Sequence, residues 1–353
     1  MSENCFLLPN VHSMNIKVKK ENRGELLHII GYSPELNNTK NKISQIKFSS
    51  WSKVRSMFNC LEFPFDSKKI RKPLSRAFFK LLELVKDHNI STEGNTLHLA
   101  EAPGGFIQAT KYIKDKKGMK NDLYYTFSIL GGKLLPIYNR ILLNDPMVKV
   151  LSTKQNKGDL YDTKNIKYLI DTLSKENVMF ITGDGGFDEN DNFESKEQLH
   201  HHLIFNQIVS ALFILGNGGT FIVKIFDIFT ELTFDFIYLL SYLFSEVYIH
   251  KPDTSRPTNS EKYIVCKHFR KDLFTFELRS IIKKICVENV NTISSFIDKS
   301  TIDMEFVEKI RQVNVYFAET QIKSIEETIE IDRLDSIINK KEYKVKEWVD
   351  KYY

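Results

Sequence analysis

Short apolar runs alternate with helical segments through the middle of the chain, and this alternation limits the possible folds more than any other feature. Residues 96–100, 178–182 and 219–226 are apolar runs typical of buried strands. Between the last two lies a long helical segment, 196–215, whose apolar residues fall mostly on one stripe. Strands that alternate with helices form a parallel sheet covered by helices on both faces. The pattern therefore predicts an α/β fold.

The remaining elements follow from the same periodicities. Helices are predicted over the segments Leu74–Val85, Phe106–Lys114, Ile166–Leu173 and 233–244. Further strands are predicted in the segments "DLYYTFSI", "MVKVLST", "EVYIH" and "EKYIVCK". The last two strands are joined by a long loop without a helix, which favours an antiparallel pair at the edge of the sheet.

Three regions of the chain differ in character. Residues 1–60 are mixed and weakly periodic, which indicates an N-terminal arm with some strand. Residues 61–270 carry the alternating pattern and are predicted to form the α/β domain. Residues 271–353 are charged and helical, and we interpret them as a helical C-terminal extension. A chain of 353 residues is long enough for one large domain with such appendages.

The charge balance and the cysteines restrict the function only loosely. The net charge of +5 permits a phosphate-rich partner without requiring one. None of the four cysteines has Cys-x-x-Cys spacing, so we interpret them as reduced thiols; neither a disulfide framework nor a metal site is expected. The first residues do not resemble a signal peptide, and the most apolar stretch, 234–244, is shorter than the ~20 residues of a membrane span. A soluble protein without a membrane partner is therefore expected.

The run His200–His202 looks like a metal site. Adjacent residues on a helix point about 100° apart, however, so three of them cannot converge on one ion. We interpret the run as part of a polar helix face.

The segment "LHLAEAPGGFIQA" combines a strand, a tight glycine turn and the start of a helix. In open α/β sheets ligands bind outside the carboxyl ends of the strands. Glycines let a ligand approach the backbone, and the helix start offers free N–H groups. The segment does not match the Gly-x-Gly-x-x-Gly or Gly-Lys-Ser/Thr patterns of nucleotide binders. An ordinary strand-to-helix turn explains the spacing equally well.

Two charged residues lie at the ends of predicted strands. Asp184 follows the strand 178–182 between glycines, which places a carboxylate at the same sheet edge as the glycine turn. The simpler alternative is a loop aspartate that caps the next helix. Lys224 interrupts the apolar run 219–226, and a lysine in a buried run is costly unless it is paired or neutral. It is a candidate base, unless its amine reaches outward to solvent.

Two further charged residues have ordinary explanations from the pattern alone. Glu261 leads into the last strand from a polar loop and could be a solvated charge. Lys80 lies on the helix 74–85 away from its apolar stripe, which predicts a solvated lysine.

Together these blocks carry more information than any one of them. The segments "EAPGGF", "GDGGF", "GNGGTFIVKIF" and "KPDTSRPTNSEKYIVCK", in this order and spacing, resemble the FtsJ-like, Adrift-type cap-specific mRNA 2′-O-methyltransferases. The segments closely resemble members encoded by African swine fever virus and related large DNA viruses. The likeness covers residues 75–267, with a weaker echo in "VYFAET" at 315–320. It implies a Rossmann-like, S-adenosylmethionine-dependent methyltransferase fold with a mostly parallel, doubly wound sheet and an antiparallel last strand.

The resemblance also implies a catalytic tetrad. The family's Lys-Asp-Lys-Glu set falls on Lys80, Asp184, Lys224 and Glu261. Lys224 would be the base that accepts the proton of the ribose 2′-hydroxyl. Lys80 would lower the pKa of Lys224, whereas Asp184 and Glu261 would raise it. The sequence does not decide which effect is larger.

The resemblance further implies S-adenosyl-L-methionine as the cofactor. Its methionine part would lie along the first turn, at Glu101, Pro103, Gly104, Gly105 and Phe106. Tyr125, expected after the second strand, would flank the cofactor, Asp159 would contact the adenine, and Asp184 would also border the cofactor. Many methyltransferases carry an acid at the end of the second strand for the ribose hydroxyls. The segment "YYTFSILGG" has none, so the ribose contact has no assigned residue.

The implied function is methylation of the ribose 2′-hydroxyl of a nucleotide next to the mRNA cap. Arg256, Asn259 and Ser260 would form the lip of the RNA groove, and "KKIRK" at 68–72 is either an RNA contact or a solvated face. Capped mRNA, and other capping or transcription proteins, are the implied partners, and a viral origin implies a cytoplasmic setting. Two alternatives remain: a 2′-O-methyltransferase of ribosomal or transfer RNA, and a catalytically silent subunit that binds cap or RNA.

Overall fold

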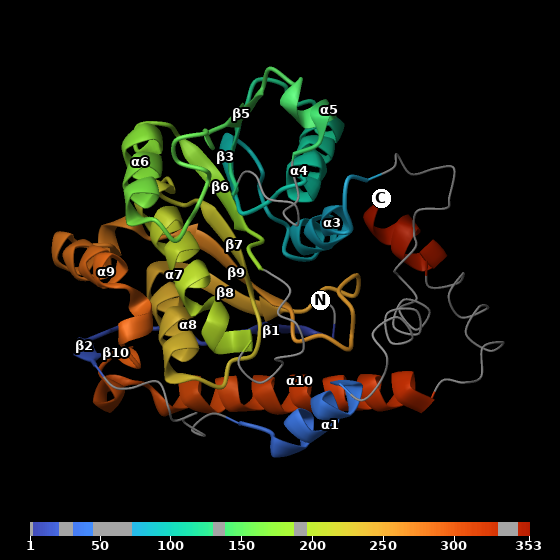
Figure 1. Cartoon of the computed structure of the whole chain (residues 1–353), viewed down its shortest axis with the longest axis vertical. Coiled ribbons are helices and arrows are strands. Elements are labelled where there is room, and N and C mark those ends of the chain that lie inside the picture. The colour runs from blue at the N-terminus through green and yellow to red at the C-terminus, as the bar shows by residue number, and fades with distance from the viewer. Residues whose placement is uncertain (1–2, 21–30, 45–72, 130–137, 187–195, 331–344) are drawn as a thin grey trace.

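A computed structural model of the chain describes residues 3–20, 31–44, 73–129, 138–186, 196–330 and 345–353. Its centre is an eight-stranded sheet with the strand order β1-β8-β9-β7-β6-β3-β4-β5 (Figure 1). The strands are β1 (Cys5–Leu7), β3 (Asn95–Leu99), β4 (Tyr124–Phe127), β5 (Val148–Val150), β6 (Val178–Gly183), β7 (Thr220–Ile225), β8 (Phe244–His250) and β9 (Lys262–Phe269). The predicted α/β class is confirmed, and every strand predicted within the α/β domain is present.

The sheet has a parallel half and an antiparallel half. Strands β5, β4, β3, β6 and β7 run parallel, whereas β9 is antiparallel to both of its neighbours, β7 and β8. The antiparallel pairing of the last two strands is therefore confirmed. Their predicted place at the edge is wrong for β9, which lies inside the sheet. Beyond β8 the edge position is taken by β1, which comes from the N-terminal arm.

Helices cover both faces of the sheet. Successive strand residues point to opposite faces, so the apolar strands present apolar side chains on both. One face packs against α6 (Thr163–Leu173), α7 (Lys196–Ile214) and α8 (Glu231–Leu243); strand residues such as Ile181 and Phe221 join this cluster. The other face packs against α3 (Ala77–Asp87) and α4 (Gly105–Lys116), and here the strand residues are Phe180 and Ile222. A short helix, α5 (Arg140–Leu143), packs beside α4.

The C-terminal residues pack into this core. Helices α9 (Phe276–Glu288) and α10 (Met304–Glu330) contribute buried side chains to the same apolar cluster as α7 and α8. Helix α10 runs along the base of the molecule beside α1 (Pro34–Ser44) (Figure 1). A two-stranded sheet pairs β2 (Ile16–Lys19) from the N-terminal arm with β10 (Ser295–Ile297). Among the described helices, none combines the length and the apolar character that crossing a bilayer requires.

Candidate active site

The functional residues gather at one edge of the sheet. The carboxyl ends of β3, β4, β6 and β7 meet there, because these strands are parallel and in register. Strand β9 runs the opposite way, so its first residues reach the same edge, where Lys262 pairs with Ile225. The topology thus brings together the turn after β3, the loop after β6, the end of β7 and the residue before β9.

The glycine turn after β3 is shaped by close packing. Gly104 has a φ of +113°, a backbone conformation that residues with a side chain rarely adopt. A Cβ at this position would also lie 2.0 Å from Leu142 Cδ1. A Cβ on Gly105 would lie 2.2 Å from Ser75 Oγ and 3.0 Å from the backbone nitrogen of Phe78. The two glycines therefore let α4 begin directly against α5 and the start of α3. The peptide bond between Ala102 and Pro103, within this turn, is cis.

Glu101 is the buried carboxylate of the turn. Its backbone N–H donates to Ser128 Oγ at 2.5 Å, and its Oε1 accepts from the backbone N–H of Phe106, at the start of α4, at 2.5 Å. Its Oε2 is buried and has no hydrogen-bond partner among the described residues. Burial raises the pKa of this carboxyl group well above its ordinary value, even though the Phe106 N–H opposes the rise. A cationic ligand group at Oε2 would satisfy the carboxylate.

Two lysine–carboxylate pairs form the centre of the site. Lys80 Nζ lies 2.5 Å from Glu261 Oε1, and Lys224 Nζ lies 3.2 Å from Asp184 Oδ1. Lys224 Nζ also donates to the backbone carbonyl of Asp184 at 2.7 Å, and Tyr263 Oη donates to Asp184 Oδ1 at 2.9 Å. All four predicted tetrad residues are therefore largely buried and paired at the expected sheet edge. The solvated position that periodicity predicts for Lys80 is wrong.

The charges of the two pairs act on one another. Burial alone would raise the pKa of Glu261, but Lys80 and Lys224 together outweigh it and hold that pKa well below its ordinary value. Burial alone would lower the pKa of Lys224, but Asp184 and Glu261 outweigh it and leave that pKa above its ordinary value. The question left open by the sequence is thus answered for the protein without ligands: the carboxylates have the larger effect, and Lys224 is an ammonium.

Hydrogen bonds between its own residues hold the loop that leads into β9 in place. Buried Lys251 donates to the carbonyl oxygen of Asn259 at 2.6 Å, to its side-chain oxygen at 2.9 Å and to the carbonyl of Glu261 at 3.0 Å. Ser255 Oγ donates to Glu261 Oε1 at 2.7 Å. Of the predicted RNA contacts, Arg256 is half-buried, Asn259 takes part in this internal network, and Ser260 is buried. The segment 68–72 lies outside the described residues.

Two predicted cofactor contacts lie at different ends of the sheet. Asp159 is half-buried in a loop whose Gly158 packs so closely that a Cβ there would lie 1.7 Å from the carbonyl oxygen of Ser128. Tyr125 lies within β4 and not after it, which corrects the predicted position. Its hydroxyl donates to Glu176 Oε2 at 2.9 Å, before the start of β6 and thus toward the opposite edge. Ser128, which the sequence did not single out, occupies the functional edge instead.

The run His200–His202 does not converge on one point. The ring of His200 lies against Phe226, His201 Nε2 is within hydrogen-bond distance of Thr230 and Thr233, and the ring of His202 lies against Tyr161. The three side chains point apart as predicted, but all three are buried, so the predicted polar helix face is wrong.

Comparisons with known proteins agree with this architecture. The sequence profile of the FtsJ-like methyltransferases matches residues 73–269, more than half of the chain. Cap-specific mRNA (nucleoside-2′-O-)-methyltransferase 2 of Drosophila melanogaster is 29% identical over 260 residues, which are 69% of this chain and 37% of that protein. A probable methyltransferase of African swine fever virus is 28% identical over 298 residues, 79% of this chain and 66% of that protein. The chain thus spans less than two thirds of either relative.

A solved structure is also similar in part. The crystal structure of a putative ribosomal RNA methyltransferase from Plasmodium falciparum has a TM-score of 0.39 and 21% identity. The aligned region covers 55% of this chain and 97% of that one.

Proposed function

The chain belongs to the FtsJ-like methyltransferase family, and we propose that it transfers a methyl group from S-adenosylmethionine to the ribose 2′-hydroxyl of a nucleotide next to the mRNA cap. The names of its relatives from Drosophila melanogaster and Caenorhabditis elegans support the cap as the substrate. The observation that carries the proposal is the pairing of Lys80 with Glu261 and of Lys224 with Asp184 beside the turn of Glu101.

The residues of the turn fit the cofactor. When bound, S-adenosylmethionine would supply a methyl group on a sulfonium sulfur, and the neutral thioether that remains after transfer is a good leaving group that needs no metal. The unpaired Oε2 of Glu101 is suited to an ammonium group, such as the one on the methionine part of this molecule. An ammonium there would also stabilise the ionised form of Glu101, whose pKa burial raises. Asp159, by family resemblance, contacts the adenine.

Lys224 is the proposed base for the 2′-hydroxyl. The Asp184 carboxylate and carbonyl both bind its Nζ, which fixes the position of the amine. Tyr263 fixes the carboxylate in turn by donating to Oδ1. Only the neutral amine accepts a proton, and the Asp184 and Glu261 carboxylates raise the pKa of Lys224 above its ordinary value, which favours the charged form. The site therefore fixes the position of Lys224 but favours its protonated form. The rate of methyl transfer should rise with pH, because more of the amine then becomes neutral.

The decisive experiment measures transfer of a labelled methyl group from S-adenosylmethionine to three acceptors: capped RNA, the same RNA without the cap, and transfer RNA. We expect wild type to methylate capped RNA at a 2′-oxygen, identified by nucleoside mass analysis. Lys224→Ala should lose activity by at least about 100-fold, because both the base and the partner of Asp184 are removed.

A matched control is Lys267→Ala. Lys267 is also a strand lysine paired with a carboxylate, Glu246 at 3.0 Å, but it lies in the second half of β9, away from the active edge. This variant should keep wild-type activity. Full activity in Lys224→Ala would refute the mechanism. Equal methylation of capped and uncapped RNA would refute the cap specificity, and cofactor binding without turnover on any RNA would favour the silent subunit.

A further inference from the structure

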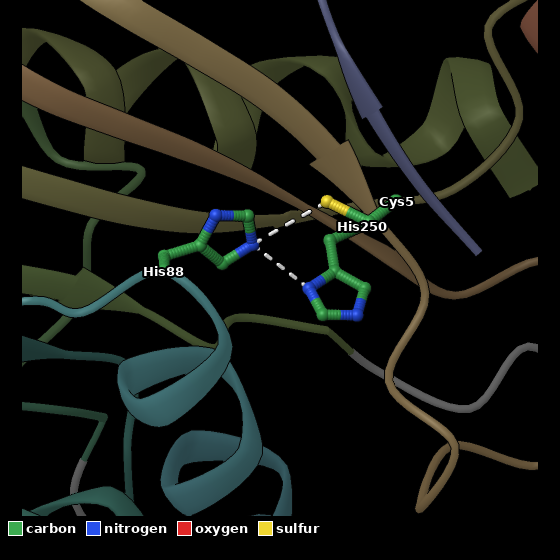
Figure 2. Close-up of side chains that lie close together, drawn as sticks. All are labelled: Cys5, His88 and His250. Atoms are coloured by element: carbon green, nitrogen blue, oxygen red, sulfur yellow. Dashed lines mark hydrogen bonds between the residues drawn. The ribbon is translucent and has the colours of Figure 1, made fainter. Parts of the chain in front are cut away.

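Three potential metal ligands meet beyond the C-terminal end of α3, whereas the glycine turn packs against the start of that helix. Cys5 lies in β1, His88 directly follows α3, and His250 is the last residue of β8 (Figure 2). Cys5 Sγ lies 3.7 Å from His88 Nε2, and His88 Nε2 lies 2.9 Å from His250 Nδ1. The three atoms are all within 4.8 Å of one another. Antiparallel pairing sets Cys5 directly opposite His250, so this proximity is built into the sheet.

The spacing of these atoms is close to that of a tetrahedral zinc site. With Zn–N distances of about 2.0–2.1 Å and a Zn–S distance of about 2.3 Å, tetrahedral geometry separates two nitrogens by about 3.3 Å and a sulfur from a nitrogen by about 3.6 Å. The observed Sγ–Nε2 separation of 3.7 Å agrees with this value. The two nitrogens, at 2.9 Å, need to separate by only about 0.4 Å.

We propose that Cys5 Sγ, His88 Nε2 and His250 Nδ1 bind a Zn²⁺ ion, with water at the fourth corner. Thiolate and imidazole are the ligands that zinc prefers, whereas magnesium and calcium prefer oxygen. The alternative is a hydrogen-bonded chain of thiol and imidazoles without an ion.

The surroundings favour a metal. The other ring nitrogen of His250, Nε2, lies 3.9 Å from Asp87 Oδ2. This distance is longer than a hydrogen bond, but it puts a carboxylate beside the ring nitrogen that the proposed ion leaves free, where metal-bound histidines usually have an outer-shell partner.

A second group of potential ligands, Glu83, Asp87 and His250, is a weaker candidate. The carboxylate of Glu83 already accepts hydrogen bonds from Thr254 and from the backbone of Asp253. Both oxygens of Asp87 accept from the hydroxyl of Tyr352. The sulfur of Cys5, in contrast, has one hydrogen-bond contact among the described residues, and that contact is with His88.

The ion would connect segments that carry the active site. Helix α3 carries Lys80 about two turns before His88, and the chain after His250 enters the loop that ends at Glu261. Zinc at this point would fasten both partners of the Lys80–Glu261 pair to the N-terminal strand. We therefore assign the site a structural role that is distinct from methyl transfer.

The test measures zinc binding to the purified full-length protein after removal of metals with a chelator. Wild type should bind one Zn²⁺ per chain in competition with a chromogenic chelator, and added zinc should raise its Tm. With Co²⁺ in place of zinc, wild type should show a thiolate-to-cobalt charge-transfer band. Cys5→Ser should lose this band and bind zinc more weakly by more than about 100-fold, beyond the usual effect of losing an outer-shell partner.

Cys286→Ser is the matched control, because Cys286 is a buried cysteine of α9 whose sulfur contacts Asn206 and none of the proposed ligands. It should bind zinc and cobalt as wild type does. His88→Gln should also bind zinc more weakly than wild type; if it does not fold, Cys5→Ser decides, since only one atom changes. Absence of stoichiometric zinc in wild type, or equal zinc binding by wild type and Cys5→Ser, overturns the proposal. The assay contains no RNA and no methyl donor, so its outcome is independent of the proposed enzyme activity.

Discussion

Replacing Glu261 by glutamine tests the electrostatic description of the active site most directly. The change removes one negative charge and keeps the size of the side chain. Lys80 then loses its ion partner at 2.5 Å, with side chains that are only 10% and 12% exposed. Breaking a buried pair by removing one partner costs about 3–5 kcal/mol. The glutamine oxygen still accepts hydrogen bonds from Lys80 and Ser255, so we expect the free energy of unfolding at pH 7 to fall by about 2–4 kcal/mol.

The pH dependence of this loss has a defined sign. The folded-state pKa of Glu261 is held below its ordinary value of 4.5 by Lys80 and Lys224, against the effect of burial. Its contribution to stability is therefore fully present above pH 4.5 and is lost as the pH falls toward the depressed pKa. The difference between wild type and Glu261→Gln should be constant at neutral pH and should shrink progressively below pH 4.5.

Urea unfolding of four proteins measures the effect: wild type, Glu261→Gln, Lys80→Met and the double variant. Because the two residues contact each other, the double variant should lose less than the sum of the single losses, by at least about 1 kcal/mol. Glu246→Gln is the control, since its carboxylate pairs with Lys267 but is 37% exposed, and it should cost less than about 1 kcal/mol. Additive losses in the cycle, or a loss that grows on acidification, would show that the pair does not stabilise the fold as described.

Three further predictions address other parts of the molecule. In wild type, kcat should rise with pH between about 7 and 9, because Asp184 and Glu261 keep Lys224 protonated; a flat pH–rate profile would exclude Lys224 as the base. Gly158→Ala should weaken S-adenosylmethionine binding by about tenfold or more in calorimetry, because its Cβ would lie 1.7 Å from a backbone oxygen at the end of β4; unchanged affinity would place the cofactor elsewhere. Asp235→Ala should lower the free energy of unfolding by about 3 kcal/mol or more in urea, because the buried N–H groups of β10 that donate to Asp235 would lose their acceptor; a loss below about 1 kcal/mol would contradict this.

The periodicity of the sequence predicts the local structure well and the strand order only in part. The predicted apolar runs 178–182 and 219–226 become β6 and β7, because a strand buried on both faces is apolar along most of its length. The insertion of β9 between β7 and β8, and the addition of β1 to the edge, depend on contacts between distant segments. No local pattern records such contacts.

Lys80 illustrates why exposure is harder to predict than secondary structure. Its position on α3, away from the apolar stripe, is read correctly from the helical period. That side of α3 is nevertheless covered, because the loop before β9 places Glu261 against Lys80, and the C-terminal segment packs Trp348 against Phe79. A buried lysine with a buried carboxylate partner looks, in sequence, the same as two solvated charges. Only the family resemblance singled out both residues.

The sequence predicts no metal site, whereas the structure leads to a proposed zinc site, and the reason for this difference is similar. Spacing rules detect metal ligands that are close in sequence, such as Cys-x-x-Cys pairs. Here His88 is 83 residues from Cys5 and 162 residues from His250. The three come together only because β1 pairs with β8 and because α3 ends beside that pair.

The C-terminal helices are connected to the active edge by hydrogen bonds as well as by the shared core. On α10, Gln321 Nε2 donates to the carbonyl of Thr258 at 3.0 Å, within the loop that leads to Glu261. Asn314 Nδ2, about two turns earlier, donates to the carbonyl of Ile228 at 2.7 Å, in the segment that follows β7 and Lys224. Helix α10 therefore contacts the chain close to Glu261 and close to Lys224, one residue from each lysine–carboxylate pair.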